Sequence, residues 1–217
     1  MDKKITKIIE MKINELKELL HKFDANLIYN SDLKKKNWFN IGGKAKLFFN
    51  ANELKDLIEF LKILNNREKI HIIGAGSNTL ITDEVYDGVI IKLGKNFNRL
   101  SILNSNIIIS GTAVLDKKLS EFAAENSLSG FEFLACIPGT IGGGLKMNAG
   151  CFGKEFKDIL VSIQAIDKTG NISTISAKEI NFDYRKNNLS DDLIFLSASF
   201  KGKKKDTKKI IESMKKL

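Results

Sequence analysis

Residues 136–150, CIPGTIGGGLKMNAG, contain the only proline of this 217-residue chain beside a cluster of glycines. Proline fixes its own φ, and glycine reaches positive φ without a Cβ, so together they shape a loop with accessible backbone amides. Successive exposed N–H groups form a concavity that binds a phosphate or pyrophosphate. We therefore interpret this stretch as part of a phosphate-binding site. The alternative is a tight loop in which the glycines only relieve strain.

A second glycine segment, GAGSNT at residues 74–79, directly follows the apolar run KIHII. It begins like a dinucleotide-binding fingerprint, but Thr79 stands in place of the third glycine and no long amphipathic helix follows. These departures argue against a Rossmann fold, and no Walker A spacing occurs. Two separate phosphate-binding candidates remain, and a dinucleotide lying between them would use both.

The composition, 43% hydrophobic and 28% charged, is ordinary for a soluble globular protein. Neither a membrane-spanning apolar run nor a signal peptide is evident, so we expect a cytoplasmic protein. Two cysteines and two histidines give no disulfide framework and no metal site. The net charge of +9 could indicate nucleic-acid binding, but the excess consists of dispersed lysines without a recognised motif.

Apolar spacing predicts an amphipathic helix over residues 5–23, within an N-terminal segment 1–24. A strand at 45–50, a helix whose start is marked by Asn50 with Glu53, and a strand at 69–73 form a β-α-β unit. Because strands crowd the second half without alternating helices, we predict an α+β fold, with a small N-terminal lobe and a larger one with a mixed or antiparallel sheet. The further elements expected are strands at 88–93, 106–110, 159–166, 171–176 and 193–200, and helices at 116–126 and 205–217.

Four segments resemble successive signatures of the UDP-N-acetylenolpyruvoylglucosamine reductase family: NWFNIGG (37–43), GAGSNTL (74–80), LSGFEFLACIPGTIGGGLKMNAGCFG (128–153) and FDYR (182–185). The resemblance implies a two-lobed FAD-binding fold of the vanillyl-alcohol-oxidase-like, PCMH-type class, with lobes at 25–95 and 96–204 and FAD in the cleft. The family continues into a C-terminal domain that we expect to be missing here, with residues 205–217 leading towards it.

The resemblance also implies which residues contact FAD, and it places Gly144 where the family commonly has Ala. The first segment would hold one part of the phosphate region, the second would hold the pyrophosphate, and the residues after them would lie near the flavin. These cofactor-binding residues are Gly74, Ala75, Gly76, Ser77, Asn78 and Thr79, then Pro138, Gly139, Thr140, Ile141, Gly142 and Gly143, and finally Asn148, Ala149 and Gly150.

Arg185 is the candidate catalytic residue, because it aligns with the catalytic arginine of the family. Hydride transfer to an enolpyruvyl β-carbon leaves negative charge beside a carboxylate, and the guanidinium fork with its permanent charge suits that charge. Lysine supplies nearly all other cations of this chain. The alternative is that Arg185 forms a surface ion pair.

The expected function is reduction of the enolpyruvyl group of UDP-N-acetylglucosamine enolpyruvate to UDP-N-acetylmuramate, with FAD and NADPH as cofactors. This reaction serves peptidoglycan synthesis, and through it cell shape and division. The expected partner is a UDP-sugar, without nucleic acid, membrane or metal, and the oligomeric state is left open. Three alternatives remain: an FAD-binding module without reductase activity, another oxidoreductase of the same fold, and a basic nucleic-acid binder.

Overall fold

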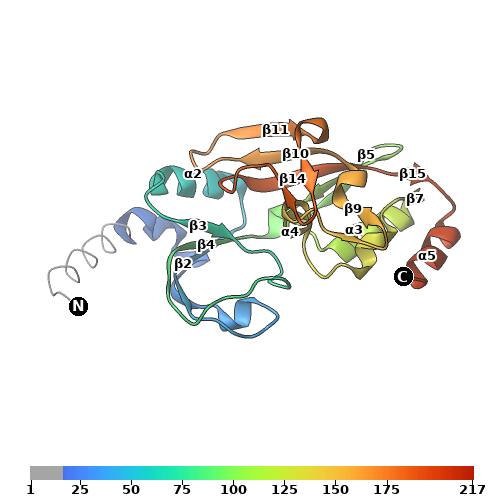
Figure 1. Cartoon of the computed structure of the whole chain (residues 1–217). Helices are drawn as coiled ribbons and strands as arrows, with labels where there is room; N and C mark the ends of the chain where they lie inside the picture. Colours follow the sequence, from blue (N-terminus) through green and yellow to red (C-terminus); the bar gives the residue numbers. More distant parts are fainter. Residues whose placement is uncertain (1–16) are drawn as a thin grey trace.

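The computed structural model describes residues 17–217, which form two main sheets (Figure 1). The first sheet has the strand order β1-β2-β4-β3. Strands β2 and β3 both run parallel to β4, and β1 runs antiparallel to β2. The strands of this sheet are β1 (Leu27–Asp32), β2 (Lys44–Ala51), β3 (Ile70–Ile72) and β4 (Tyr86–Leu93).

Helix α2 (Leu54–Leu64) connects β2 to β3, which confirms the predicted β-α-β unit, although β4 is inserted between the two strands. The predicted start of the helix was wrong. Asn50 pairs with Lys92 of β4 inside the sheet, and Glu53 is the residue at the N-cap. Pairing with β4 extends β2 through Ala51, so Asn50 is held in extended backbone and cannot begin the helix.

The second sheet is antiparallel throughout, with the strand order β11-β10-β14-β6-β5. This confirms the antiparallel sheet and the strand-rich second half that the sequence predicted. The strands are β5 (Leu100–Asn104), β6 (Ile107–Gly111), β10 (Leu160–Ile166), β11 (Ile172–Ser176) and β14 (Ile194–Lys201).

Helices α3 (Asp116–Glu125) and α4 (Ile141–Lys146) and the 3-10 helix η4 (Glu132–Cys136) contribute to the core of the second sheet. Their buried apolar side chains form one cluster with those of β6, β10 and β14. The glycine-rich segment was predicted to be a loop, but residues 141–146 are helical. Isoleucine and leucine at the two ends of α4 are fully buried, and this burial outweighs the low helix propensity of glycine.

The cores of the two sheets are not separate, because Ile166, Ile194 and Leu196 of the second sheet pack into the cluster of the first. This cluster contains three stacked or edge-on phenylalanines, with ring centroids of Phe49 and Phe60 only 4.0 Å apart. In Figure 1, α2 lies beside the left-hand ends of β10 and β14, where β10 ends and β14 begins. A Cβ on Gly170, in the turn after β10, would lie 3.3 Å from Ile58 of α2.

Helix α5 (Thr207–Lys215) confirms the predicted helical tail, and its partner surface is formed by η4 and α3. Ile210 is buried there, whereas Ile211 and Leu217 stay exposed. Most of the predicted helix at 5–23 lies outside the described residues; residues 17–20 are helical and are followed by η1 (His21–Asn26). None of the helices in residues 17–217 has the length and apolar character needed to cross a membrane.

The remaining elements are short and mostly frame the site. The paired strands are β7 (Leu128–Ser129) with β15 (Lys203–Lys204), β8 (Gly150–Cys151) with β9 (Lys154–Glu155), and β12 (Phe182–Asp183) with β13 (Lys186–Asn187). The other 3-10 helices are η2 (Lys34–Lys36), η3 (Lys95–Phe97), η5 (Phe156–Asp158) and η6 (Ala177–Glu179).

Candidate functional site

The two glycine segments predicted from the sequence meet in the structure. A Cβ on Gly74 would overlap the Thr140 hydroxyl, so the two backbones approach as closely as glycine allows. The Ser77 hydroxyl donates a hydrogen bond to the carbonyl oxygen of Pro138. Residues 74–79 and 138–143 therefore form one site, which lies between the first sheet and α4.

The first segment has a row of backbone donors that the protein does not use. Within residues 17–217, none of the N–H groups of residues 74–79 donates a hydrogen bond to another part of the chain. Gly76 has φ +69°, and a Cβ there would lie 2.5 Å from the carbonyl oxygen of Lys36. The Trp38 N–H donates to the Gly76 carbonyl over 3.0 Å, which fixes this turn. Its amides are thus held in place and available to an anion.

The second segment offers fewer donors than the sequence suggested. The N–H groups of Ile141 and Gly142 donate to the carbonyl oxygens of Val114 and Thr112, each over 2.9 Å. They have no free backbone donor for a ligand. Across the described part of the chain, the N–H groups of Gly139, Thr140 and Gly143 have no protein acceptor, so these three residues are the available donors of the segment.

Asp116, at the start of α3, lies against the second segment. Its side chain is fully buried, and neither carboxyl oxygen has a hydrogen-bond partner in the described structure. One of them, Oδ2, lies 2.9 Å from the position that a Cβ on Gly139 would occupy. Burial raises the pKa of Asp116 to about 8, so the carboxyl group is mostly neutral at pH 7. No full negative charge therefore lies beneath the candidate phosphate site.

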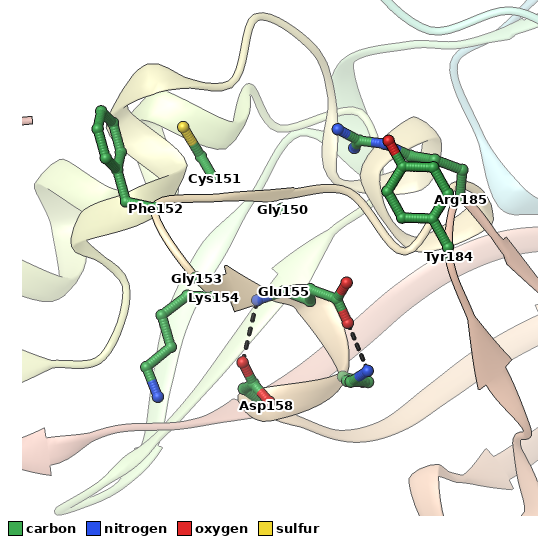
Figure 2. Close-up of a pocket in the computed structure, with 10 residues that line it drawn as sticks. Gly150, Cys151, Phe152, Gly153, Lys154, Glu155, Asp158, Tyr184 and Arg185 are labelled. Carbon is green, nitrogen blue, oxygen red and sulfur yellow. Dashed lines mark hydrogen bonds and ion pairs between the residues drawn. The ribbon is translucent and has the colours of Figure 1, made fainter.

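A cavity of about 450 Å³ lies beyond α4, between two short hairpins (Figure 2). One wall is the β8–β9 hairpin with its turn, and the other is Tyr184 and Arg185 at the tip of the β12–β13 hairpin. The Arg185 guanidinium carbon is 5.5 Å from the centroid of the Tyr184 ring. Among the predicted site residues, Gly150 and Arg185 line this cavity, whereas the two glycine segments do not.

Two of the charged side chains that line the cavity are paired with each other. Glu155 forms an ion pair with Lys157, and this hydrogen bond is the main reason why the pKa of Glu155 is lowered; Asn148 and Arg185 add to the effect. The N–H of Tyr184 bonds to Asp183 and lowers the pKa of that carboxyl group. Arg185 has no ion pair in the described residues, and its guanidinium is available to a ligand anion.

Asn148 and Ala149, which were predicted near the flavin, connect the two parts of the site. Both are buried, and the N–H of Ala149 donates to the Gly144 carbonyl over 2.8 Å. The Asn148 side chain donates to Glu155 and to the Asp183 carbonyl, and it accepts from the N–H of Lys157. Sequence reasoning missed Asp116, Glu155 and Lys157; the only local signal was the spacing of Glu155 and Asp158, which form a capping box.

Two sheets joined by converging glycine segments with free amides are typical of a protein that binds a dinucleotide cofactor. The model of the FAD binding domain family matches residues 45–176, and the chain belongs to this family. The solved structure of p-cresol methylhydroxylase shares the fold, with a TM-score of 0.60 at 15% identity over 91% of this chain and 44% of that one. This confirms the predicted two-lobed FAD-binding fold.

Within this class the chain is similar to UDP-N-acetylenolpyruvoylglucosamine reductases. The chain is 62% identical to the reductase of Pelagibacter ubique, over 92% of this chain and 66% of the relative. The chain is 47% identical to the reductase of Rickettsia typhi, over 86% of this chain and 63% of the relative. The structure of the Thermus caldophilus enzyme has a TM-score of 0.76 at 26% identity, over 88% of this chain and 66% of that one. The chain thus spans slightly less than two thirds of these proteins.

Proposed function

We propose that this chain holds FAD and the catalytic arginine of a UDP-N-acetylenolpyruvoylglucosamine reductase, which uses NADPH to make UDP-N-acetylmuramate in the cytoplasm for peptidoglycan synthesis. The observation that carries the proposal is the meeting of the two glycine segments, with unpaired amides on both, at the start of α4, while the cavity that contains Arg185 lies beyond this helix. The identity of 62% to the Pelagibacter ubique reductase supports the same substrate class.

The residues present fit the diphosphate of FAD. The free amides of residues 74–79, with those of Gly139, Thr140 and Gly143, would donate to its phosphate oxygens. Gly76 and Gly139 have no room for a Cβ, because atoms of Lys36 and Asp116 lie where it would stand, so the close packing of these backbones requires glycine. The neutral carboxyl group of Asp116 removes a source of repulsion.

The chemistry that bound FAD supplies is hydride transfer, from NADPH to the enolpyruvyl β-carbon of the UDP-sugar. Arg185 would bind the carboxylate of that group through its planar fork and stabilise the negative charge that develops on the adjacent α-carbon. The Tyr184 ring lies within cation–π distance of the guanidinium, with its centroid 5.5 Å from the guanidinium carbon. The proton that completes the product at the α-carbon has no assigned donor among the residues of this cavity.

A second function starts from the FAD binding domain family alone, whose model matches residues 45–176. In this reading the chain binds FAD but does not complete the reduction. Both functions require bound FAD, and only the first includes reduction of the enolpyruvyl substrate. A flavin spectrum of the purified protein tests what they share, and NADPH oxidation that depends on the enolpyruvyl sugar nucleotide distinguishes them.

The Arg185→Ala variant tests the proposed reductase. We expect it to keep its yellow colour and FAD content, because Arg185 lies outside the glycine segments, and to lose at least about 100-fold in substrate-dependent NADPH oxidation. Arg67→Ala is the matched control, since Arg67 is an exposed arginine outside the cavity. A colourless wild-type protein that takes up no added FAD would overturn both functions. Full turnover by Arg185→Ala would refute only the role of the arginine and would leave the FAD site standing.

A further inference from the structure

Arg185 occupies the tip of a hairpin that is too short to be stable alone. Strands β12 and β13 have two residues each, pair through Phe182 with Asn187 and Asp183 with Lys186, and are joined by Tyr184 and Arg185. Arg185 is exposed and has φ +57°. An isolated two-stranded hairpin is marginal even when longer. The position of the guanidinium therefore depends on what holds this hairpin against the rest of the protein.

The base of the hairpin is bonded to the end of α4. The Asn187 side-chain amide donates to the carbonyl oxygens of Leu145 and Lys146 over 3.0 and 3.1 Å. Its Oδ1 accepts from the N–H of Leu189 over 3.0 Å. These bonds satisfy carbonyl groups that a helix leaves free at its C-terminus. They fix the hairpin at its base, two residues after Arg185.

Asn148 holds the hairpin close to its tip. Its Nδ2 donates to the carbonyl oxygen of Asp183 over 3.3 Å and to Oε2 of Glu155 over 3.1 Å, while Oδ1 accepts from the N–H of Lys157 over 3.2 Å. The residue is 1% exposed. Both amide hydrogens are thus used, and one side chain joins the hairpin of Arg185 to the opposite wall of the cavity.

We propose that Asn148 is a positioning residue for Arg185: its amide locks the β12–β13 hairpin to the β8–β9 hairpin and to the segment that follows the glycine-rich helix α4. The consequence is that the free amides before α4 and the guanidinium of Arg185 belong to one rigid unit. The role of the guanidinium rests on the proposed function, whereas the locking of the hairpin does not.

The backbone of Asn148 determines which variants are informative. Its φ of +40° is strained for Ala but not for Gly, so Asn148→Gly removes the amide without adding backbone strain. Asn148→Asp also tolerates this φ and keeps the acceptor for Lys157, but it loses both donated bonds and repels Glu155. The matched control is Asn126→Ala, because Asn126 is a partly buried asparagine whose amide bonds to the Phe122 carbonyl, away from the hairpin.

The locking is tested first without any ligand, by limited trypsin digestion followed by mass spectrometry of the cut sites. Trypsin cuts after Arg185 or Lys186 only when the hairpin opens locally. We expect both Asn148 variants to be cut there roughly tenfold faster than the wild type, and Asn126→Ala to be cut at the wild-type rate. Unchanged cutting in a folded Asn148 variant overturns the proposal, and so does equal acceleration in Asn126→Ala.

The effect on Arg185 is tested in FAD-loaded protein, by titrating UDP-N-acetylglucosamine enolpyruvate and following the flavin absorbance. We expect Asn148→Gly to weaken substrate binding roughly tenfold when Arg185 is present. In an Arg185→Ala background it should cause no additional loss of binding, because the two residues act in one unit. An equal loss in both backgrounds contradicts a role through Arg185. If Arg185→Ala itself binds like the wild type, the proposed role of Arg185 in binding the substrate carboxylate fails, while trypsin still decides whether the hairpin is locked.

Discussion

At the scale of single residues, Asp116 gives the sharpest prediction because it is a buried carboxyl group without a hydrogen-bond partner. Burial raises its pKa to about 8 in the folded protein, from an ordinary value of 3.8 for an aspartate. At a pH between these two pKa values, Asp116 has lost its proton in the unfolded chain but keeps it in the folded protein. Stability therefore falls as pH rises from about 4 to about 8, by at most roughly 1.4 kcal/mol per pH unit.

The Asp116→Asn variant removes this titration. We expect its free energy of unfolding to exceed that of the wild type by an amount that grows from pH 5 to pH 8, as measured by urea denaturation at each pH. Asp83→Asn serves as the control for loss of one negative charge, because Asp83 is exposed and forms no ion pair within residues 17–217, and we expect it not to reproduce this growing difference. Parallel pH profiles for the wild type and Asp116→Asn would show that the carboxyl group is not held neutral by burial.

The residue scale also shows what the sequence could reveal about the site. Free amides in the segment 74–79 were predictable, because Gly and a polar turn after a strand leave few acceptors nearby. The donors of Ile141 and Gly142 were predicted to face a ligand, but tertiary pairing with Val114 and Thr112 occupies them. Asp116 was not identified because nothing in its local sequence indicates burial against Gly139.

At the scale of elements, the glycine-rich helix α4 depends on packing rather than propensity. A Cβ on Gly144 would lie 2.5 Å from Cζ of Phe156, whose ring is fully buried. Gly144→Ala gains about 1 kcal/mol in helix propensity, but overpacking a core costs about 1–3 kcal/mol. We expect a net loss of about 1 kcal/mol in the free energy of unfolding, measured by urea denaturation.

Gly143→Ala is the matched control for this prediction. The nearest atom to its added Cβ is the Thr140 hydroxyl oxygen at 3.9 Å, so the same substitution one residue earlier meets no obstacle. We expect it to be neutral or stabilising by less than about 1 kcal/mol. Equal effects at the two positions would mean that the Phe156 ring moves aside and that packing does not require glycine at 144.

The elements that the sequence predicted well are those with a strong apolar pattern. Strands β2, β4, β10 and β14 and helix α2 bury a continuous face or core, and this burial is visible as periodicity. Strand β5 is an edge strand with mostly exposed residues, and therefore gave no signal. The helical character of α4 was hidden because glycine lowers helix propensity, and only the tertiary contacts of Ile141 and Leu145 restore it.

At the scale of the whole molecule, the shared core matters more than the division into lobes. A division at residue 95 treats each lobe as a unit, but Ile166, Ile194 and Leu196 lie beyond it and pack with the first sheet. The sequence could not assign them, because a buried strand residue has the same pattern whichever core it joins. We therefore propose that the two lobes unfold as one cooperative unit.

Two substitutions test this cooperativity, one in each apolar cluster: Leu196→Ala in the shared core and Ile163→Ala in the core of the second sheet. Each is expected to cost about 2–5 kcal/mol, as is usual for a large-to-Ala change at a buried position. Trp38, the only tryptophan, reports on the first lobe by fluorescence, and far-UV circular dichroism reports on all secondary structure. If the lobes unfold together, both probes give one coincident urea transition, and Ile163→Ala shifts the Trp38 signal although the two residues belong to different lobes. A Trp38 transition that Ile163→Ala leaves in place would mean that the first lobe unfolds on its own, and that the contacts of Ile166, Ile194 and Leu196 do not couple the two sheets.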